Sequence, residues 1–319
     1  MSTVRRIVVD TDTGIDDAHT LLYLAGRADA EIVAITSVYG NCVEEDAARN
    51  IGYVTGLLGL DVPVFRGADK PLEGAPHIAG YVHGHDGLGD RGYDRPQAPA
   101  PGEPAAEALV RLAREHPGEL DLLALGPLTN LAQALRLDPE LFTRYRSVVL
   151  MGGSGPYPPP GTHLTVDANV NNDPAAARAV FSAPRRELVM VGVNVTSVTL
   201  LTEPAIAALR AADTPKARFA CEILDSYLNF YQYHWGRRII PLHDPLAAGI
   251  LLDPSFATGH VLGPVNVVAH GPQSRAHLMR TADGLPPAFR YEDAPPTKVI
   301  TAVDSARFVA DFVEVLTRP

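Results

Sequence analysis

Hydrophobic positions along the chain follow two alternating patterns. Short runs rich in β-branched and aliphatic residues predict strands, and longer segments with one apolar face predict helices between them. Strands are expected at Ile7–Val9, Glu31–Val38, Val62–Phe65, Leu120–Leu125, Ser147–Met151 and Glu187–Val193. Helices are expected at Asp16–Arg27, Val43–Leu58, Pro104–Glu115, Leu128–Leu135 and Pro174–Phe181. Strands that alternate with helices in this way are typical of an α/β fold.

Some of the predicted strands are apolar throughout, as at Ile32–Ile35 and Leu122–Leu125. Strands without polar positions are buried on both faces, as in a parallel sheet covered by helices. The pattern therefore predicts an open, mostly parallel, doubly wound sheet flanked by helices.

After about Asn194 the pattern becomes helical, which predicts a C-terminal elaboration of the sheet. The elements expected there are helices at Pro204–Ala212 and Thr214–His234, a strand pair formed by Val265–Ala269 and Lys298–Ala302, and a closing helix at Asp304–Leu316. No shift in composition marks a boundary, so residues 1–319 are expected to form a single domain.

Two long segments, Arg66–Gly102 and Gly152–Asn172, are rich in Gly, Pro and His, and each begins where a predicted strand ends. Loops of this length in a compact α/β domain are usually functional or disordered. Ligands of open α/β folds bind outside the carboxyl ends of the strands. We therefore expect both segments to border a binding site.

Composition narrows the possible functions. The chain is 46% hydrophobic and 20% charged, as in ordinary globular proteins, and its net charge of −10 repels nucleic acid. No apolar run approaches the roughly 18 residues that span a bilayer, and the N-terminal residues lack the pattern of a secretory signal. The two cysteines, Cys42 and Cys221, have no disulfide or metal spacing. We expect a cytoplasmic protein whose partner is neither nucleic acid nor a membrane.

The most informative run is Asp10-Thr11-Asp12-Thr13-Gly14-Ile15-Asp16-Asp17, directly after the first strand. Its four carboxylates in eight residues repel one another unless their charge is compensated. A hard cation such as Ca²⁺ or Mg²⁺, which prefers oxygen ligands, would compensate it. One alternative is that Asp16 and Asp17 only cap the following helix. Another is a phosphatase of the haloacid dehalogenase type, whose Asp-x-Asp-x-Thr signature the run matches loosely, with Gly14 in place of Thr.

Four further motifs follow this run in order. They are Val38-Tyr39-Gly40-Asn41, His83-Gly84-His85-Asp86-Gly87-Leu88-Gly89, Gly126-Pro127-Leu128-Thr129-Asn130-Leu131-Ala132 and His243-Asp244-Pro245-Leu246-Ala247. Together the five motifs resemble those of the inosine-uridine-preferring nucleoside hydrolases. The resemblance implies an open α/β fold, hydrolysis of the N-glycosidic bond of ribonucleosides, one bound Ca²⁺, and a homodimer or homotetramer.

The resemblance also implies roles for individual residues. Ca²⁺ would be held by Asp12, Asp17, Asp244 and the backbone carbonyl of Thr129. Asp12 would be the general base toward a water on the ion, because the metal positions that water and lowers its pKa. His243 would give a proton to the departing base, and its alternative role is merely to orient Asp244.

Other residues would contact the substrate: Asp16, Asn41, His83, Met151, Asp167 and Asn169. Asp16 and Asn169 would hydrogen-bond the ribose diol. His83 has an alternative as a solvated loop histidine beside His85. In the family, the helix region corresponding to Tyr227–His234 helps to close over the base. Aromatic side chains at this spacing are as often part of a core, so Tyr227, Tyr231, Tyr233 and His234 receive no role.

The chain departs from the family in one place. Asp167 stands where a Glu is expected, and Gly161 aligns with an expected Asn; in the family these two residues grip the 5′-hydroxyl end of the ribose. We therefore hypothesise a substrate with a modified or enlarged 5′ position, or another N-ribosyl compound. A rival from a different class is a catalytically silent protein that binds metal and sugar.

Overall fold

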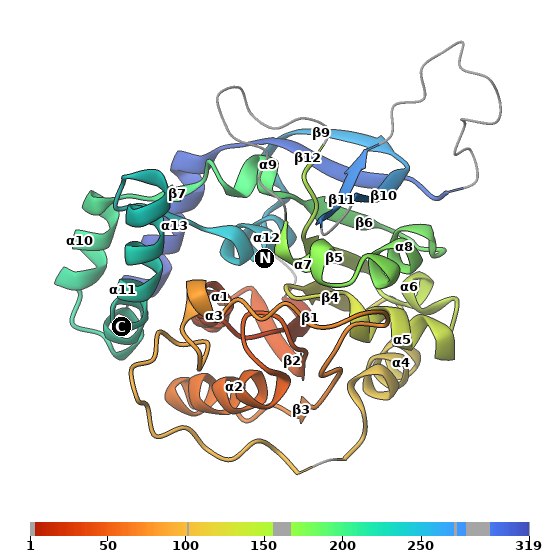
Figure 1. Ribbon diagram of the computed structural model, residues 1–319, viewed down its shortest axis with the longest axis horizontal. Helices are drawn as coiled ribbons and strands as arrows, with labels where there is room; N and C mark the ends of the chain where they lie inside the picture. The colour runs from red at the N-terminus through yellow and green to blue at the C-terminus, as the bar shows by residue number, and fades with distance from the viewer. Residues whose placement is uncertain (1–3, 101, 156–166, 271–272, 279–293, 319) are drawn as a thin grey trace.

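The computed structural model describes residues 4–100, 102–155, 167–270, 273–278 and 294–318. Its centre is an eight-stranded sheet with strand order β3-β2-β1-β4-β5-β6-β12-β9 (Figure 1). The strands are β1 Arg5–Thr11, β2 Ala30–Ser37, β3 Val64–Phe65, β4 Leu120–Ala124, β5 Ser147–Met151, β6 Leu188–Val191, β12 Thr297–Val303 and β9 Ala257–Gly263. Neighbouring strands are parallel except for β12 and β9. The predicted open, mostly parallel sheet is confirmed.

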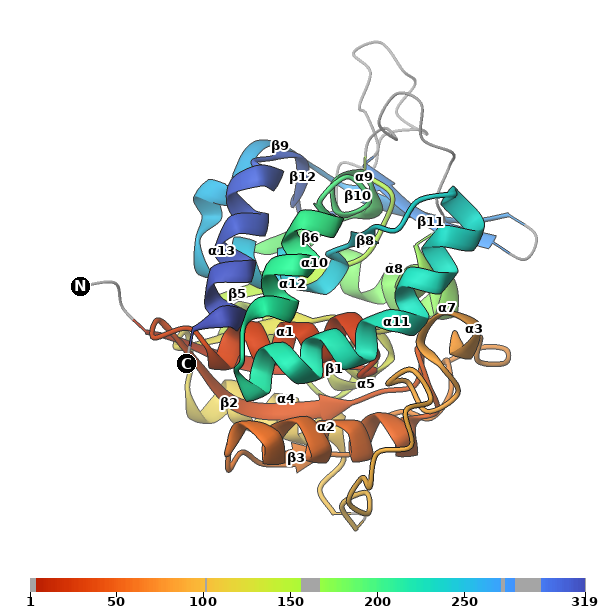
Figure 2. The ribbon, with the colours of Figure 1, turned by 90° about the vertical axis from the view of Figure 1, so that its left-hand side faces the viewer.

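Helices cover both faces of the sheet because each strand buries apolar side chains on both. In β1, Ile7 and Val9 belong to one apolar cluster and Val8 to the other, as expected when successive side chains point to opposite faces. Helices of the first cluster are α1 Ile15–Ala25, α2 Glu44–Leu58, α11 Pro215–Trp235, α12 His243–Leu252 and α13 Ser305–Thr317; α1, α11 and α13 lie together in Figure 2. Those of the second are α4 Ala105–Glu115, α5 Thr129–Leu137 and α8 Pro174–Ser182.

The strand order reverses between β1 and β4, and this position determines where the site lies. After β1 the chain adds β2 and then β3 on one side of the sheet. After β4 it adds β5 and then β6 on the other side. Crossovers on opposite sides leave a crevice at the carboxyl ends of the two central strands. The acidic run follows β1 there, and Gly126 follows β4.

The predicted pairing of Val265–Ala269 with Lys298–Ala302 is wrong. The second segment is β12, which pairs with β6 and β9 and extends the main sheet. The first is β10, Val265–His270, which pairs with β11, Gln273–Leu278. Val265 and Val267 belong to the second apolar cluster, together with side chains of α8. The apolar pattern predicted both strands, but it carries no information about which partner each strand takes.

The sequence missed several short elements and one long one. Helix α12 was missed because almost all of its side chains are buried, and a helix that is apolar all round has no amphipathic period. Both predicted loops contain a short helix, α3 Gly80–His83 in the first and α7 Ala168–Asn172 in the second. The sequence also missed α6 Leu141–Arg144, α9 Val193–Thr196, β7 Leu200–Leu201, β8 Ile240–Pro241 and the 3₁₀ turn Pro254–Phe256. Helix α10, Glu203–Ala211, confirms the helix predicted at Pro204–Ala212.

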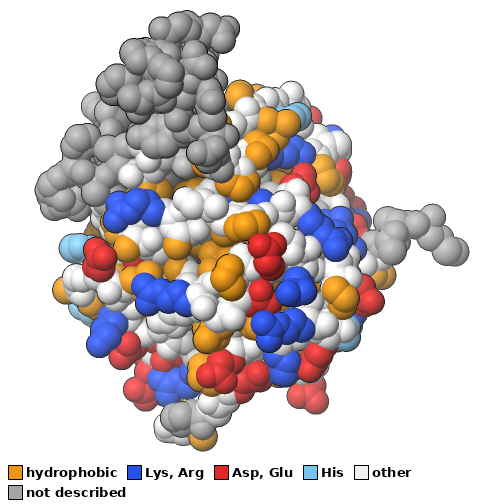
Figure 3. All heavy atoms as spheres, turned by 90° about the vertical axis from the view of Figure 1, so that its right-hand side faces the viewer, with side chains coloured by type: hydrophobic (Ala, Val, Ile, Leu, Met, Phe, Trp, Pro, Cys, Tyr) orange, Lys and Arg blue, Asp and Glu red, His pale blue; other side chains and the backbone are white. Residues whose placement is uncertain are grey.

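The described surface carries charges of both signs. On the face shown in Figure 3, acidic and basic side chains of the described residues are interspersed, unlike the basic stripe of a nucleic-acid-binding face. None of the helices in the described ranges combines the length and apolar character that a bilayer span requires.

Candidate active site

A cavity lies at the carboxyl edge of the sheet, bordered by the turns after β1, β4 and β5 and by α3, α7, α11 and α12. It brings together segments from residue 16 to residue 244. Its lining is Asp16, Asn41, Ala79, Tyr81, Val82, His83, Leu125, Met151, Asp167, Ala168, Asn169, Val193, Tyr227, Phe230, Tyr231, His243 and Asp244. Of the predicted site residues, Asp12, Asp17 and Thr129 are not part of this lining.

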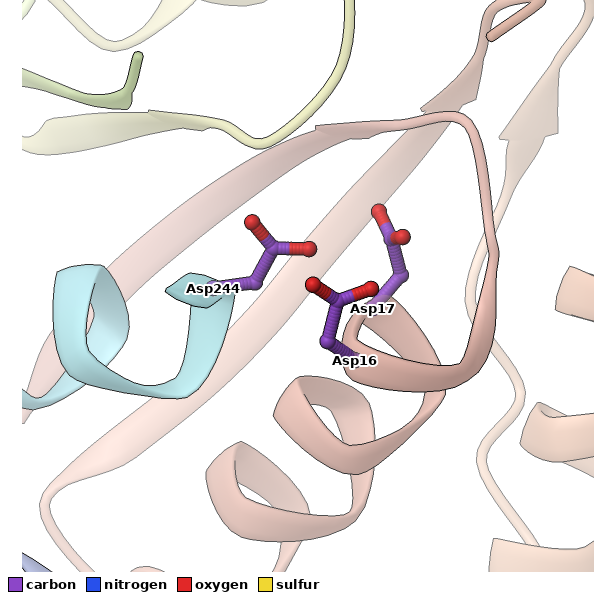
Figure 4. Close-up of side chains that lie close together, drawn as sticks. All are labelled: Asp16, Asp17 and Asp244. Carbon is purple, nitrogen blue, oxygen red and sulfur yellow. The ribbon is translucent and has the colours of Figure 1, made fainter. Parts of the chain in front are cut away.

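Carboxylates from two segments that lie far apart in the sequence come together at this cavity. Asp16 and Asp17 lie in the first turn of α1 and Asp244 in the first turn of α12 (Figure 4). One carboxylate oxygen from each lies within 4.8 Å of the other two. Asp12 lies beside them, because Nδ2 of Asn41 contacts the carboxylates of both Asp12 and Asp17. The sequence motifs around residues 10–17 and 243–247 therefore form one acidic cluster, consisting of Asp12, Asp16, Asp17 and Asp244.

The surrounding backbone holds Asp12 and Asp17 in place. Asn41 donates to Asp12 through its backbone N–H at 2.8 Å and through Nδ2 at 3.2 Å, and the same Nδ2 lies 2.9 Å from Asp17. Asp17 also accepts from the Thr11 hydroxyl and from the N–H of Gly14. A Cβ at Gly40 would lie 2.0 Å from the Asp12 carboxylate, so only glycine permits this close approach.

Burial and mutual repulsion disfavour charge on all four carboxylates. Burial raises the pKa of Asp16 to about 6. Burial and the Asp17 charge hold the pKa of Asp12 well above its usual range, and burial and Asp16 do the same for Asp244. The pKa of Asp17 is raised by burial and by Asp16. No lysine or arginine is found in the described lining of the cavity, so none of these lining side chains compensates the charge of the carboxylates.

This donor set fits a divalent cation. The four residues are at most 6% exposed, and Oδ1 of Asp16 has no hydrogen-bond partner. A cluster of hard oxygen donors with an unused lone pair is the environment that calcium or magnesium takes. A helix-capping role alone, the alternative considered for Asp16 and Asp17, does not explain why Asp244 comes from the far end of the chain to meet them.

Asp10, the first acid of the run, lies outside the cavity. Its Oδ1 accepts from the hydroxyl of Thr36 at 2.5 Å and from Nδ2 of Asn130 at 2.7 Å, while Oδ2 has no partner. Burial raises the pKa of Asp10 to about 7. Asn130 also donates to the carbonyl of Ser37. The asparagine of the Gly-Pro-Leu-Thr-Asn motif therefore ties the ends of β1 and β2 together beneath the site.

Thr129, expected to offer a backbone carbonyl to the metal, begins α5, and its hydroxyl donates to Asp173 at 2.7 Å. Leu125 lines the cavity, and its carbonyl accepts from Nδ2 of Asn169 at 2.6 Å. The adjacent Gly126 lies against Asp12, because a Cβ there would be 3.1 Å from the Asp12 Cγ. The sequence did not single out Leu125, because a backbone carbonyl leaves no side-chain signal.

The two predicted histidines are both at the cavity. His83 is 5% exposed, whereas His85 is exposed, so the alternative of a solvated loop histidine is wrong for His83. His83 Nδ1 accepts from the backbone N–H of Ile15 at 3.1 Å. His243 begins α12, with Nδ1 2.6 Å from the Thr196 hydroxyl and Nε2 3.2 Å from the Tyr231 hydroxyl. Burial lowers the pKa of both rings to about 4.

An aromatic wall from α11 faces the acidic cluster. Tyr227 donates to Asp16 at 3.1 Å and its ring lies 5.1 Å from that of Tyr231. Phe230 and the largely exposed Tyr81 continue the wall outward, with ring centroids 6.1 Å apart. Tyr233, which is 86% exposed, and His234 do not line the cavity. The side chains that reach the cavity thus combine apolar surface with hydroxyl groups.

On the opposite wall, Asn169 and Asp167 come from α7. Nδ2 of Asn169 donates to the carbonyls of Leu125 and Met151. Asp167 caps α7, accepting from the N–H groups of Asn169 at 3.2 Å and Val170 at 2.7 Å. Gly161, the other departure from the family pattern, lies outside the described residues.

Comparison with known proteins agrees with this geometry. The sequence matches the model of the inosine-uridine preferring nucleoside hydrolases over residues 7–310. The enzyme of that name from Crithidia fasciculata is 35% identical over 257 residues, covering 80% of this chain and 81% of that protein. Probable uridine nucleosidase 2 of Oryza sativa subsp. japonica is 34% identical over 259 residues, covering 80% and 76%. The structure of the plant nucleoside hydrolase PpNRh1 has a TM-score of 0.91 at 28% identity and covers 99% of both chains.

The agreement extends over nearly the whole chain and includes both halves of the acidic cluster, which the family match spans. The chain therefore belongs to the inosine-uridine preferring nucleoside hydrolase family and is a glycosidase that cleaves ribonucleosides.

Proposed function

We propose that the protein hydrolyses ribonucleosides to free base and ribose at a Ca²⁺ held by the acidic cluster. The observation that supports this most directly is that Asp16 and Asp17 lie within 4.8 Å of Asp244 beside Asp12, in a cavity without a described cationic side chain. Asp12, Asp17 and Asp244 are the proposed carboxylate ligands. The carbonyl of Leu125 at the cavity wall is better placed than Thr129 to add a backbone ligand.

Asp12 is the proposed general base. Asn41 holds both of its oxygens, one by the backbone and one by the side chain, so the carboxylate has a fixed orientation. A divalent cation held by these carboxylates would supply orientation of the ribose hydroxyls and a lowered pKa for the attacking water. Asp12 would accept the proton of that water as the C–N bond breaks. Since the transition state carries positive charge on the sugar, the surrounding carboxylates also stabilise it.

The ribose and the base take opposite sides of the cavity in this proposal. Asp16 and Asn169 hydrogen-bond the ribose diol, and His243 supplies a proton to the leaving base. The aromatic wall of Tyr81, Phe230 and Tyr231 faces the base. Ring faces bind purines and pyrimidines alike, so this wall is compatible with both.

A second candidate is the same reaction on a nucleoside with an altered 5′ group. The supporting observation is Asp167, whose carboxylate oxygens already accept two N–H groups of α7. A carboxylate so engaged has less capacity to bind a 5′-hydroxyl than a longer Glu would. Comparing kcat/KM of inosine, uridine and their neutral 5′-substituted analogues decides between the two candidates; faster turnover of the parent nucleosides rules out the second.

We test the proposed function by measuring base and ribose release from inosine and uridine with Ca²⁺ present. Asp12→Asn is expected to lower kcat roughly 10²- to 10⁴-fold. The control is Asp253→Asn, because Asp253 ends α12 away from the cavity and bonds Ser255 and Arg307. No release by the native protein contradicts the proposal. Ribose binding without release favours the catalytically silent protein instead.

We also retain the proposals of a cytoplasmic location and a homodimer or homotetramer. Both cysteines are free, which suits a reducing compartment. Sedimentation analysis of the purified protein tests the oligomeric state.

A further inference from the structure

Thr196 touches the ring that is proposed to protonate the leaving base, although it does not line the cavity. It lies on α9, a single helical turn after β6, and is fully buried. Its hydroxyl oxygen is 2.6 Å from Nδ1 of His243, the shorter of the two contacts that the ring makes. Nε2 on the other side of the ring is 3.2 Å from the Tyr231 hydroxyl, and both His243 and Tyr231 line the cavity.

The neighbouring hydroxyls show that this orientation is particular to Thr196. Ser197 and Thr199 each donate to the backbone carbonyl four residues earlier, at 2.5 Å and 3.0 Å. Such back-bonding is the ordinary use of a helical hydroxyl. In contrast, the hydroxyl of Thr196 contacts the imidazole of α12, 47 residues further along the chain.

A hydroxyl suits this position because it can both donate and accept. It donates to Nδ1 when that nitrogen carries no proton, and it accepts from Nδ1–H when the ring is protonated. Thr196 therefore holds the ring at one angle in each protonation state. A backbone carbonyl could only accept and a valine could do neither, so a bare Nδ1 would lose its buried partner.

We propose that Thr196 is a positioning residue that fixes His243 by Nδ1, so that Nε2, which also contacts the Tyr231 hydroxyl, is the nitrogen that serves the leaving base. This inference rests on the proposed function. In the step, His243 first takes a proton from solvent. Its Nε2–H bond then breaks as an N–H bond forms on the departing base, which keeps the electron pair of the C–N bond. The ring is left neutral, with its remaining proton on Nδ1 directed to the Thr196 oxygen.

The test compares two kinds of substrate, which differ in whether their leaving group needs a proton. Inosine and uridine release a poor leaving group, whereas p-nitrophenyl β-D-ribofuranoside releases a stable anion that needs none. Thr196→Val is expected to lower kcat on inosine and uridine roughly ten- to a hundredfold, with little change in KM and little change on the p-nitrophenyl riboside. Thr196→Ser, which keeps the hydroxyl, is expected to restore most of the loss.

Two controls separate positioning from a structural role. Thr199→Val removes another buried hydroxyl, which bonds Val195 and Ser305, and is expected to leave both activities unchanged. His243→Ala is expected to show the same substrate dependence as Thr196→Val, and the double variant to lose no more than His243→Ala alone.

Equal losses on both kinds of substrate, failure of the serine variant to restore activity, or additive losses in the double variant each overturn the assignment of Thr196. If the native protein cleaves none of the three ribosides, the proposed function fails and this inference with it. If the native protein cleaves these ribosides and Thr196→Val cleaves them at the native rate, the assignment of Thr196 is overturned while the proposed function stands.

Discussion

The backbone N–H of Ile15 donates to Nδ1 of His83 over 3.1 Å, which joins the first turn of α1 to α3. An acceptor nitrogen carries no proton, so the neutral ring of His83 has its proton on Nε2. His83 also lies against Tyr227, with ring centroids 5.2 Å apart. Its orientation is thus set by the same turn that carries the acidic cluster.

This contact suggests two roles for His83 that can be tested independently: Nδ1 accepts from Ile15 and stabilises the fold, and Nε2–H is available to the substrate. We expect His83→Asn to keep the acceptor for Ile15 and therefore nearly the native midpoint of thermal unfolding, but to lower kcat/KM because Nε2–H is lost. His83→Phe should lower both, since a buried N–H left unpaired costs about 1–3 kcal/mol. Calorimetry and steady-state kinetics measure the two effects. Native kcat/KM in His83→Asn would show that Nε2 does not act on the substrate.

Calcium should bind at the acidic cluster and stabilise the fold. A ligand that binds only the folded state stabilises it by mass action, so calcium at about 100 times its Kd should raise the unfolding midpoint by roughly 5 °C. A chelator should remove both this stabilisation and the activity. Asp244→Asn should abolish the calcium-dependent shift.

Asp253→Asn is the matched control for Asp244→Asn, because Asp253 lies at the other end of the same helix and bonds Ser255. It should keep the full calcium response. Titration calorimetry that gives equal calcium affinity for the two variants would contradict a metal site at Asp244.

Much of this site was predictable because its carboxylates lie in sequence motifs next to strands of strong apolar pattern. Asp12 and Asp17 follow β1, and a turn that contains Gly14 brings them together. The contribution of Asp244 required the family resemblance, because nothing local in the sequence relates α12 to α1. Thr196 gave no signal, since a helix of one turn has no period to recognise.

Two further features could not be predicted from the sequence, for a different reason. They are the pairing partner of each C-terminal strand and the position of the Leu125 backbone carbonyl. β12 and β10 have similar apolar patterns, yet only β12 continues the main sheet. The proposed ligand at Leu125 is its backbone carbonyl, which is the same in every residue type. Both depend on tertiary packing rather than on local preference.

Asp10 should make stability depend on pH. Its pKa is raised from 3.8 to about 7 in the folded protein, so the folded state holds this proton more tightly than the unfolded state. The stability it contributes is complete below about pH 4 and is lost as the pH rises toward 7. Asp10→Asn keeps the acceptor for Thr36 and Asn130 but cannot ionise.

We therefore expect the free energy of unfolding of Asp10→Asn, relative to that of the native protein, to increase as the pH rises from 4 to 7. The increase should be a few kcal/mol at most. Denaturant unfolding of both proteins at one fixed calcium concentration measures the difference and cancels the titration of the other carboxyls. A difference that does not change over this range would mean that folding does not raise the pKa of Asp10.

The charge of the cavity makes a prediction about substrates. Five carboxylates, those of the acidic cluster and that of Asp167, lie at or beside it, and the described lining contains no lysine or arginine. Burial lowers the pKa of His83 and His243 to about 4. The charge of the proposed Ca²⁺ is balanced by its own carboxylate ligands, so a 5′-phosphate would meet no described cationic side chain and would lie near like charges, which costs several kcal/mol.

We expect inosine 5′-monophosphate and uridine 5′-monophosphate to have kcat/KM at least about 100-fold below the parent nucleosides, since 2.7 kcal/mol corresponds to that factor. Neutral 5′-deoxy analogues serve as the control, because they alter the same position without adding charge and should lose much less. The comparison is made at two salt concentrations, since screening of a repulsion should raise the phosphate rate at high salt. Equal turnover of nucleoside and monophosphate would require a cation at the 5′ end, and would refute the view that the acidic cluster sets the charge of the whole cavity.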